Sequence, residues 1–452
     1  MRPYAIKAVL GAMLALGLSG CNKYLTGPKL GTDPNDPTTA SNGALFVSSE
    51  VNFNAQLESR LARSVCIWMQ QCGGQSQYLA LGTYSVAEDD YYINWSSFYG
   101  GGGLIDLKTI ESRSLATSDS IFWGQATVLE ALFMGTTADL WGDIPYSEAA
   151  NPSFPRPHLD PQQTVYTALQ ARLDTAIIFL AATGPTNKGA GDNDLVYAGD
   201  PAKWTELAHT LKARFYMHVA RRDATAYANA AAEAAQGIQP GDDFELALSG
   251  NGPTSSNFWS VFQSIFPGYV VAGFYLDSVM VADSDPRLPL YFATNANGDY
   301  QGGKPGVADA PSNLSTLSST RLDGAFPQPF VTWAETQLIL AEATYQTDNT
   351  DAGGTARGAL QAVWNSVGIT RTAPTPGTPG PTDSLMNAIM MEKYISLFQN
   401  VETWSDWKRT GIPNIQPPPG FQIPRRLTYP LSERDANPNI PGPGPARNWN
   451  DP

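Results

Sequence analysis

Aromatic rings beside amide and carboxylate groups are the side chains of this chain with the clearest chemical use. Tyr91, Tyr92, Asn94 and Trp95 follow two aspartates within the segment 89–99. Sugars present apolar C–H faces and a polar rim, so flat rings beside amides and acids suit them. Packing of the larger rings into a helical core is the alternative interpretation of the same pattern.

A second aromatic segment runs from 258 to 275. Phe258, Trp259 and Phe274 are its candidate ligand contacts, and they lie in a stretch rich in glycine and serine. Such a stretch is poor material for a helical core, which favours a binding loop. Core packing again remains the alternative.

Residues for covalent or metal chemistry are scarce. The chain has three histidines, and His209 and His218 are nine residues apart, about two and a half helical turns, too far to share a metal on one helix. We find no nucleophile-elbow, phosphate-loop or metalloprotease motif. Acid pairs such as Asp89 and Asp90 could serve a glycosidase, but an acidic chain offers many such pairs. We therefore expect neither an enzyme, nor a cofactor, nor a metal site.

Cys21 ends a short apolar run with the sequence Leu-Ser-Gly-Cys. The positively charged start and the short apolar run predict a signal peptide over residues 1–20, because the run is too short to span a bilayer. Cleavage before Cys21 would leave an amine and a thiol that can carry acyl chains such as palmitate. We expect a lipid-anchored envelope protein, with an ordinary secretory signal as the alternative.

Charge excludes some partners. The net charge of −14 becomes −16 after removal of residues 1–20, which carry two basic and no acidic side chains. This balance argues against nucleic acid or anionic lipid as the main partner. We expect contact with the membrane through the lipid anchor only.

Cys66 and Cys72 are the remaining cysteines. On a continuous helix their Cα atoms would lie about 9 Å apart along the axis, too far for a disulfide. We expect two separate thiols unless the helix ends near Gln70.

Helical periodicity dominates the chain and predicts a mainly α-helical body. Residues 21–40 are rich in Pro, Asn and Asp and predict an extended leader, whereas 41–452 predict one helical domain. Within it, about 239–328 reads as a long irregular insertion. The predicted helices cover 46–68, 121–140, from Pro161 to 177, 201–219, 226–236, 332–345, 356–367 and 383–408.

Several segments together resemble the SusD/RagB family of nutrient-binding outer-membrane lipoproteins. No exact 34-residue repeat is present, so the resemblance rests on motifs. The segments that carry it, in family order, are D-L-W-G-D-I-P-Y-S-E-A at 139–149, D-P-Q-Q-T-V-Y at 160–166, Y-A-G-D with K-W and L-K-A-R at 197–214, D-P-R-L at 285–288, A-E-A at 341–343, E-T-W-S-D-W-K-R-T-G at 402–411 and P-R-R-L-T-Y-P at 424–430.

The resemblance implies a tetratricopeptide-like scaffold of helical pairs that carries a long loop-rich insertion. It also implies a non-catalytic, cell-surface lipoprotein of the bacterial outer membrane that binds an oligosaccharide or peptide. Such proteins deliver their ligand to a SusC-like TonB-dependent barrel. The sequence after Cys21 lacks the acidic cluster that often accompanies surface export in this family. The alternative is an envelope assembly lipoprotein whose helical scaffold docks other proteins.

Overall fold

The computed structural model describes residues 40–377 and 383–442. Cys21, the predicted signal peptide and residues 21–39 of the predicted leader lie outside the described residues. No described helix combines the length and the apolar character that crossing a bilayer requires.

The fold is mainly helical, as predicted. The helices are α2 (Asn42–Leu57), α3 (Arg60–Trp68), α4 (Tyr92–Tyr99), α5 (Leu104–Ala116), α6 (Ser120–Trp141), α7 (Gln162–Leu180), α8 (Pro201–Val219), α9 (Ala226–Ala234), α10 (Phe258–Ile265), α11 (Phe274–Ala282), α12 (Leu288–Tyr291), α13 (Trp333–Thr347), α14 (Thr355–Ser366), α15 (Ser384–Ser396), α16 (Glu402–Thr410) and α17 (Leu431–Ala436). Short 3-10 helices include η1 (Ser76–Thr83) and η2 (Glu88–Tyr91). The strands are β1 (Cys72–Gly74), β2 (Phe244–Glu245), β3 (Val270–Ala272) and β4 (Pro329–Val331).

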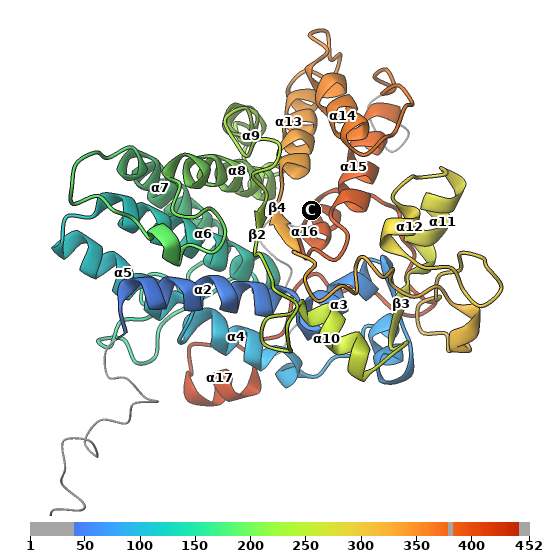
Figure 1. Ribbon diagram of the computed structural model, residues 1–452, viewed down its shortest axis with the longest axis horizontal. Coiled ribbons are helices and arrows are strands. Elements are labelled where there is room, and N and C mark those ends of the chain that lie inside the picture. Colours follow the sequence, from blue (N-terminus) through green and yellow to red (C-terminus); the bar gives the residue numbers. More distant parts are fainter. Residues whose placement is uncertain (1–39, 378–382, 443–452) are drawn as a thin grey trace, which may run out of the picture.

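Consecutive helices form an array in which each packs on the next. α5 contacts α6, α6 contacts α7, α7 contacts α8 and α8 contacts α9 (Figure 1). The chain then leaves the array and returns at α13, which packs against α9, α14 and α15. The segment between α9 and α13 is therefore an insertion between two neighbouring helices of the scaffold.

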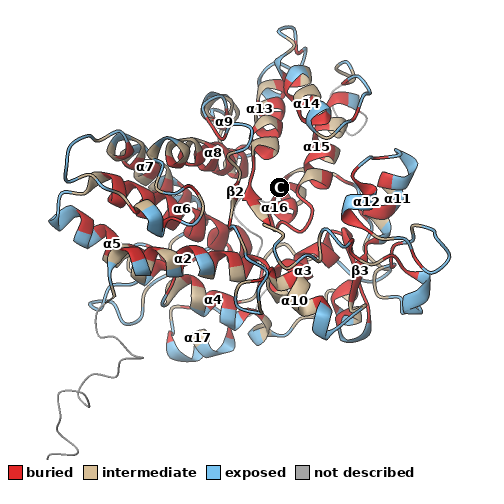
Figure 2. Ribbon diagram, in the orientation of Figure 1, coloured by how far each residue is buried: buried red, intermediate tan, exposed pale blue. Residues whose placement is uncertain are grey.

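The core is centred on α6. Every residue of this helix from Ile121 to Trp141 is buried, because other helices and the C-terminal segment surround it (Figure 2). The outlying α17, by contrast, has no buried residue. Its buried polar side chains, Gln125, Glu130 and Asp139, therefore need partners within the protein.

The insertion at 239–328 contains more helix than its composition predicts. It forms α10, α11 and α12, and β3 pairs antiparallel with β1, with Cys72 opposite Ala272. Apolar side chains such as Trp259, Leu276 and Met280 are fully buried in these helices. Their partners come from segments far away in sequence, and the local glycine and serine content does not reveal them.

Two predicted helices are each broken in two. The predicted helix 46–68 ends at Leu57, and Ser59 caps the next helix by accepting a hydrogen bond from the Leu61 amide. The predicted helix 383–408 is interrupted after α15, where Gln399 has a φ of 66°. Apolar periodicity continues across both breaks, so periodicity alone does not reveal them.

Cys66 and Cys72 form a disulfide with a Cα–Cα separation of 5.1 Å. The expectation of two separate thiols is therefore wrong. Helix α3 ends at Trp68 and Gln70 adopts a φ of 51°, which folds the chain back so that Cys72 reaches Cys66. The sequence permitted a disulfide only if the helix ended near Gln70, and the structure shows that it does.

Candidate ligand-binding site

The break between α2 and α3 positions the helix that carries the candidate site. Glu58 lies at this break with no exposed surface. Its carboxylate accepts hydrogen bonds from the Phe258 amide at 2.6 Å and from Nδ2 of Asn257 at 3.1 Å. Asn257 in turn caps α10 by accepting from the Trp259 amide at 2.9 Å. α10 is thereby fixed beside α3 (Figure 1).

Four rings then form a continuous cluster, which we call the aromatic face: Tyr78, Phe262, Phe266 and Tyr269. Ring centroids are 5.1 Å apart between Tyr78 and Phe262, 5.3 Å between Phe262 and Phe266, and 5.2 Å between Phe266 and Tyr269. Phe266 is 39% exposed, Phe262 and Tyr269 are half-buried, and Tyr78 is buried. The outer edge of the cluster is therefore open to solvent.

Two arginines of α3 border the aromatic face. The Arg63 guanidinium lies 4.0 Å from the Phe262 ring centroid, and the Arg60 guanidinium lies 5.6 Å from that of Tyr78. Arg60 also pairs with Asp90 at 3.1 Å. Flat rings with a charged, hydrogen-bonding border can stack on the C–H face of a sugar and bond its hydroxyl groups.

Burial changes the ionisation of the groups beneath this face. Desolvation raises the pKa of the Glu58 carboxyl to about 8, against the opposing effect of the hydrogen bond from the Phe258 amide. Burial also lowers the pKa of Arg63, although the contact with the Tyr78 hydroxyl acts in the opposite direction. Neither side chain is exposed enough to meet a ligand directly, so both support the rings above them.

Of the predicted ligand residues, Tyr91, Trp259 and Asn94 are buried. Tyr91 and Trp259 have no exposed surface, and Asn94 is 4% exposed. Asn94 donates to Oε1 of Gln56 and to the Ser59 hydroxyl, both at 2.9 Å, which ties α4 to the break between α2 and α3. These three side chains serve packing in the structure, the alternative that the sequence left open, and ligand contact through them stays a prediction.

Trp95 lies at a separate pocket. Its ring packs 5.4 Å from Trp141 and 5.7 Å from Tyr429, and 3% of the residue is exposed. The exposed edge contributes to a cavity of about 360 Å³ whose other lining residues include Tyr99, Phe154, Glu433 and three prolines.

The remaining predicted residues reach solvent. Tyr92 is 47% exposed, Phe274 is 42% exposed and Phe258 is half-buried. Lys304 places its Nζ 5.3 Å from the Phe274 ring centroid. Their accessibility permits ligand contact, which stays a prediction for all three.

The structure brings the two predicted segments close together through α3. Arg60 reaches Asp90 in the first segment, and Arg63 reaches Phe262 in the second. Sequence reasoning did not select Tyr78 or the two arginines. The available signal was that Arg60 and Arg63 are three residues apart and so share one face of a helix.

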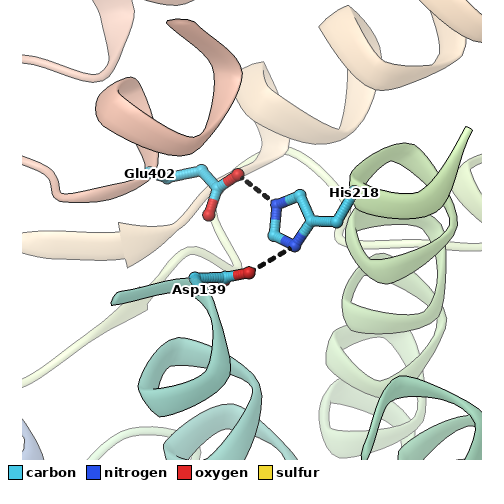
Figure 3. Close-up of side chains that lie close together, drawn as sticks. All are labelled: Asp139, His218 and Glu402. Atoms are coloured by element: carbon cyan, nitrogen blue, oxygen red, sulfur yellow. Dashed lines mark hydrogen bonds and ion pairs between the residues drawn. The ribbon is translucent and has the colours of Figure 1, made fainter. Parts of the chain in front are cut away.

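His218 lies in a fully buried cluster of ionisable groups, away from the aromatic face. Its Nδ1 is 2.7 Å from Oδ1 of Asp139 and its Nε2 is 2.6 Å from Oε1 of Glu402 (Figure 3). Burial disfavours the charged ring, but the two carboxylates outweigh that effect and raise the pKa of His218 to about 9. The ring is therefore an imidazolium that donates to an acid on each side.

This cluster has the composition of a metal site but the hydrogen bonding of an ion network. The Tyr166 hydroxyl donates to Asp139, and Arg214 lies 3.8 Å from Glu402 while pairing with Glu335 of α13 at 2.6 Å. Each His218 nitrogen already faces a different carboxylate, so the ring does not offer a lone pair to a shared ion. The Arg214–Glu335 pair thus joins α8 to α13.

Comparison with known families specifies the class of this helical protein. Residues 34–430 match the model of a SusD-like family described as "Starch-binding associating with outer membrane". Because the match covers most of the chain, this protein belongs to the SusD-like family, as the sequence motifs indicated.

Solved structures share the fold. A chitin-binding protein superposes with a TM-score of 0.75 at 21% identity, over 88% of this chain and 94% of its own. A chitin-binding SusD homologue from Flavobacterium johnsoniae gives 0.75 at 21%, over 90% and 98%. A SusD/RagB family protein from Bacteroides thetaiotaomicron gives 0.71 at 20%, over 89% and 95%. No curated protein sequence shows significant similarity to this chain.

Proposed function

We propose that this chain is a non-catalytic, lipid-anchored protein of the outer membrane that captures an oligosaccharide and delivers it to a SusC-like TonB-dependent transporter. The observation that carries the proposal is the aromatic face, whose outer ring, Phe266, is 39% exposed and whose buried ring, Tyr78, lies beside Arg60, which pairs with Asp90. Exposed rings of this kind bind the apolar faces of sugar rings, and the charged border supplies hydrogen bonds.

Two further observations support an oligosaccharide over a peptide. The family description names starch, and two of the structural relatives are described as chitin-binding. The aromatic face also joins several rings in series, and a chain of sugars has a repeating apolar face that can meet successive rings. A peptide has no such repeat.

The anchoring part of the proposal rests on Cys21 and on the family's description as associated with the outer membrane. Acylation at Cys21 would hold the helical body on the membrane through lipid alone. The leader between Cys21 and α2 would then separate the body from the bilayer.

A titration tests the binding function. The full-length lipoprotein in mild detergent is titrated calorimetrically with maltoheptaose and with chitohexaose. An aromatic contact contributes about 1 kcal/mol, so Phe266→Ala is expected to weaken binding of the preferred sugar at least about fivefold. Phe421→Ala removes a comparably exposed ring outside the aromatic face and is expected to leave affinity unchanged. Equal affinity of the Phe266→Ala variant and wild type would refute the role of the aromatic face.

Co-purification tests the delivery function. The lipoprotein is extracted from its native membrane in mild detergent, and its partners are identified by mass spectrometry. A stoichiometric TonB-dependent barrel is the expected result. Recovery with other envelope proteins and without a barrel would support the assembly alternative, in which the helical scaffold docks protein partners.

A further inference from the structure

A second cavity, of about 790 Å³, lies within the helical array and not at the aromatic face. Its walls come from the end of α8, from α9, α11, α13 and α15, and from the loop that follows α16. Figure 1 shows α13, α15 and α16 between α9 and α11. The volume falls within the roughly 300–1,000 Å³ range typical of small-molecule sites.

The buried charges around Glu342 at this cavity balance one another. Glu342, the fully buried carboxylate of the lining, is bound by both terminal nitrogens of Arg409. Behind it, Lys393 and Arg409 both pair with Asp406, and Lys393 lies 3.7 Å from Glu342. These two acids and two bases neutralise one another. Asp383, the other buried carboxylate of the lining, is bound by the Tyr345 hydroxyl and by the Leu385 and Met386 amides.

The rest of the lining combines rings, thioethers and amides. Tyr227 of α9 and Tyr275 of α11 are half-buried, and so are Met386 and Met391. Tyr345 is held in place because its hydroxyl donates to Oδ2 of Asp383 at 2.7 Å.

Carboxamides are the commonest polar groups of this lining: Gln346, Asn349, Asn387 and Asn414. Each carries both a donor and an acceptor, as sugar hydroxyl groups do. The exposed Arg221 adds a cation at the rim.

We infer that this cavity is a second carbohydrate site, which takes a short, uncharged saccharide between the tyrosine rings and the carboxamides. The tyrosines and methionines match the C–H faces of a sugar, the amides match its hydroxyl groups, and the two buried carboxylates of the lining are already engaged by Arg409 and by Tyr345. This inference rests on the proposed function for its class of ligand, but its residues are entirely different from those of the aromatic face. The protein would then hold one saccharide chain at two places, or two chains at once.

The test uses the Phe266→Ala variant of the full-length lipoprotein as background, so that binding at the aromatic face is already weakened. Maltotriose and triacetylchitotriose are titrated by ligand-observed NMR. Gln346→Trp then places a large ring at the mouth of the cavity from an exposed position of α13. Gln163→Trp, at an exposed position of α7, is the matched control.

We expect the Phe266→Ala protein still to bind the trisaccharide. Adding Gln346→Trp should weaken this binding at least tenfold, and adding Gln163→Trp should leave it unchanged. Asn349→Trp blocks the same cavity from a different position and should weaken binding to a similar extent. A loss of binding shared by both variants would then not be caused by misfolding of one of them. Complete loss of binding in the Phe266→Ala background would overturn the second site and leave the proposed function intact. Unchanged binding with both blocking variants would also overturn it, whereas failure of the wild type to bind either sugar would overturn both proposals.

Discussion

The guanidinium of Arg63 lies 4.0 Å from the centroid of the Phe262 ring and joins α3 to α10. Arg63 also donates to the Tyr78 hydroxyl at 3.3 Å and to the carbonyl oxygen of Glu58 at 3.0 Å. One buried side chain thus contacts two rings of the aromatic face and the chain break that positions α10. The geometry of the aromatic face depends on this contact, although Arg63 itself is buried.

Replacing this arginine with lysine tests that dependence. Lysine keeps the charge but loses the planar group that stacks on Phe262, so Arg63→Lys is expected to destabilise the protein by about 1–2 kcal/mol. Binding of the preferred oligosaccharide should weaken as the aromatic face loosens, which calorimetry measures. Arg371→Lys is the control, because Arg371 stacks 4.6 Å from Trp364 away from α10. Equal effects of the two variants on binding would contradict the prediction.

Substitutions of a buried aromatic residue in α10 and of the exposed Phe266 that follows it should separate effects on stability from effects on binding. Trp259 has no exposed surface, so Trp259→Ala is expected to lower the free energy of unfolding by about 3–5 kcal/mol. Phe266→Ala, at an exposed position, should cost far less stability and more affinity. Denaturant melts and titrations of both variants check this. If Trp259→Phe folds stably but loses affinity, Trp259 contacts the ligand, as the sequence allowed.

The pKa of about 8 at Glu58 predicts a dependence of stability on pH. The unfolded carboxyl ionises near pH 4.3, so between there and about pH 8 the folded state holds one more proton than the unfolded state. Stability should therefore fall with rising pH across that window, by about 1.4 kcal/mol per pH unit from this group.

Glu58→Gln removes this titration while keeping an acceptor for the Phe258 amide. Its unfolding free energy should decline less steeply between pH 5 and 8 than that of the wild type, as measured by urea melts at several pH values. Parallel curves for the two proteins would show that Glu58 is ionised throughout. Glu58→Ala, which leaves the amide without its acceptor, should be less stable than Glu58→Gln at every pH.

Local signals in the sequence predicted the scaffold well. The predicted starts of α8 and α15 are confirmed: Asp200 caps α8 by accepting from the Ala202 amide, and Asp383 caps α15 by accepting from the Leu385 and Met386 amides. The break at Glu58 was not predictable in this way, because its stabilising partner, the Phe258 amide, is 200 residues away. Apolar periodicity simply continues through such a break.

The aromatic face was predictable only in part, because it too depends on distant contacts. Composition identified the aromatic segment 258–275 but could not tell its buried rings from its exposed ones, since Trp259 and Phe266 lie in the same segment. The phase of α10 turns Trp259 and Gln263, four residues apart, inward, whereas Phe266 follows the end of this helix and is exposed. That phase is known only once the segment is known to be helical, and distant contacts decide that.

The buried imidazolium of His218 predicts a loss of stability at alkaline pH. Its pKa of about 9 in the folded state exceeds the unfolded value of about 6.5. The folded state therefore holds the extra proton between these values, and the stabilisation is complete below pH 6.5 and disappears as pH rises through 9. A shift of this size corresponds to about 3 kcal/mol.

His218→Gln abolishes this titration but leaves a polar side chain between Asp139 and Glu402. The variant should be several kcal/mol less stable than the wild type at pH 6, because the two buried carboxylates then lose the cation between them, although Arg214 remains 3.8 Å from Glu402. The difference should shrink between pH 7 and 9, since only the wild type loses its proton there. Urea melts of both proteins from pH 6 to 9.5 measure the difference, and a gap that does not change with pH would show that folding does not raise the pKa of His218.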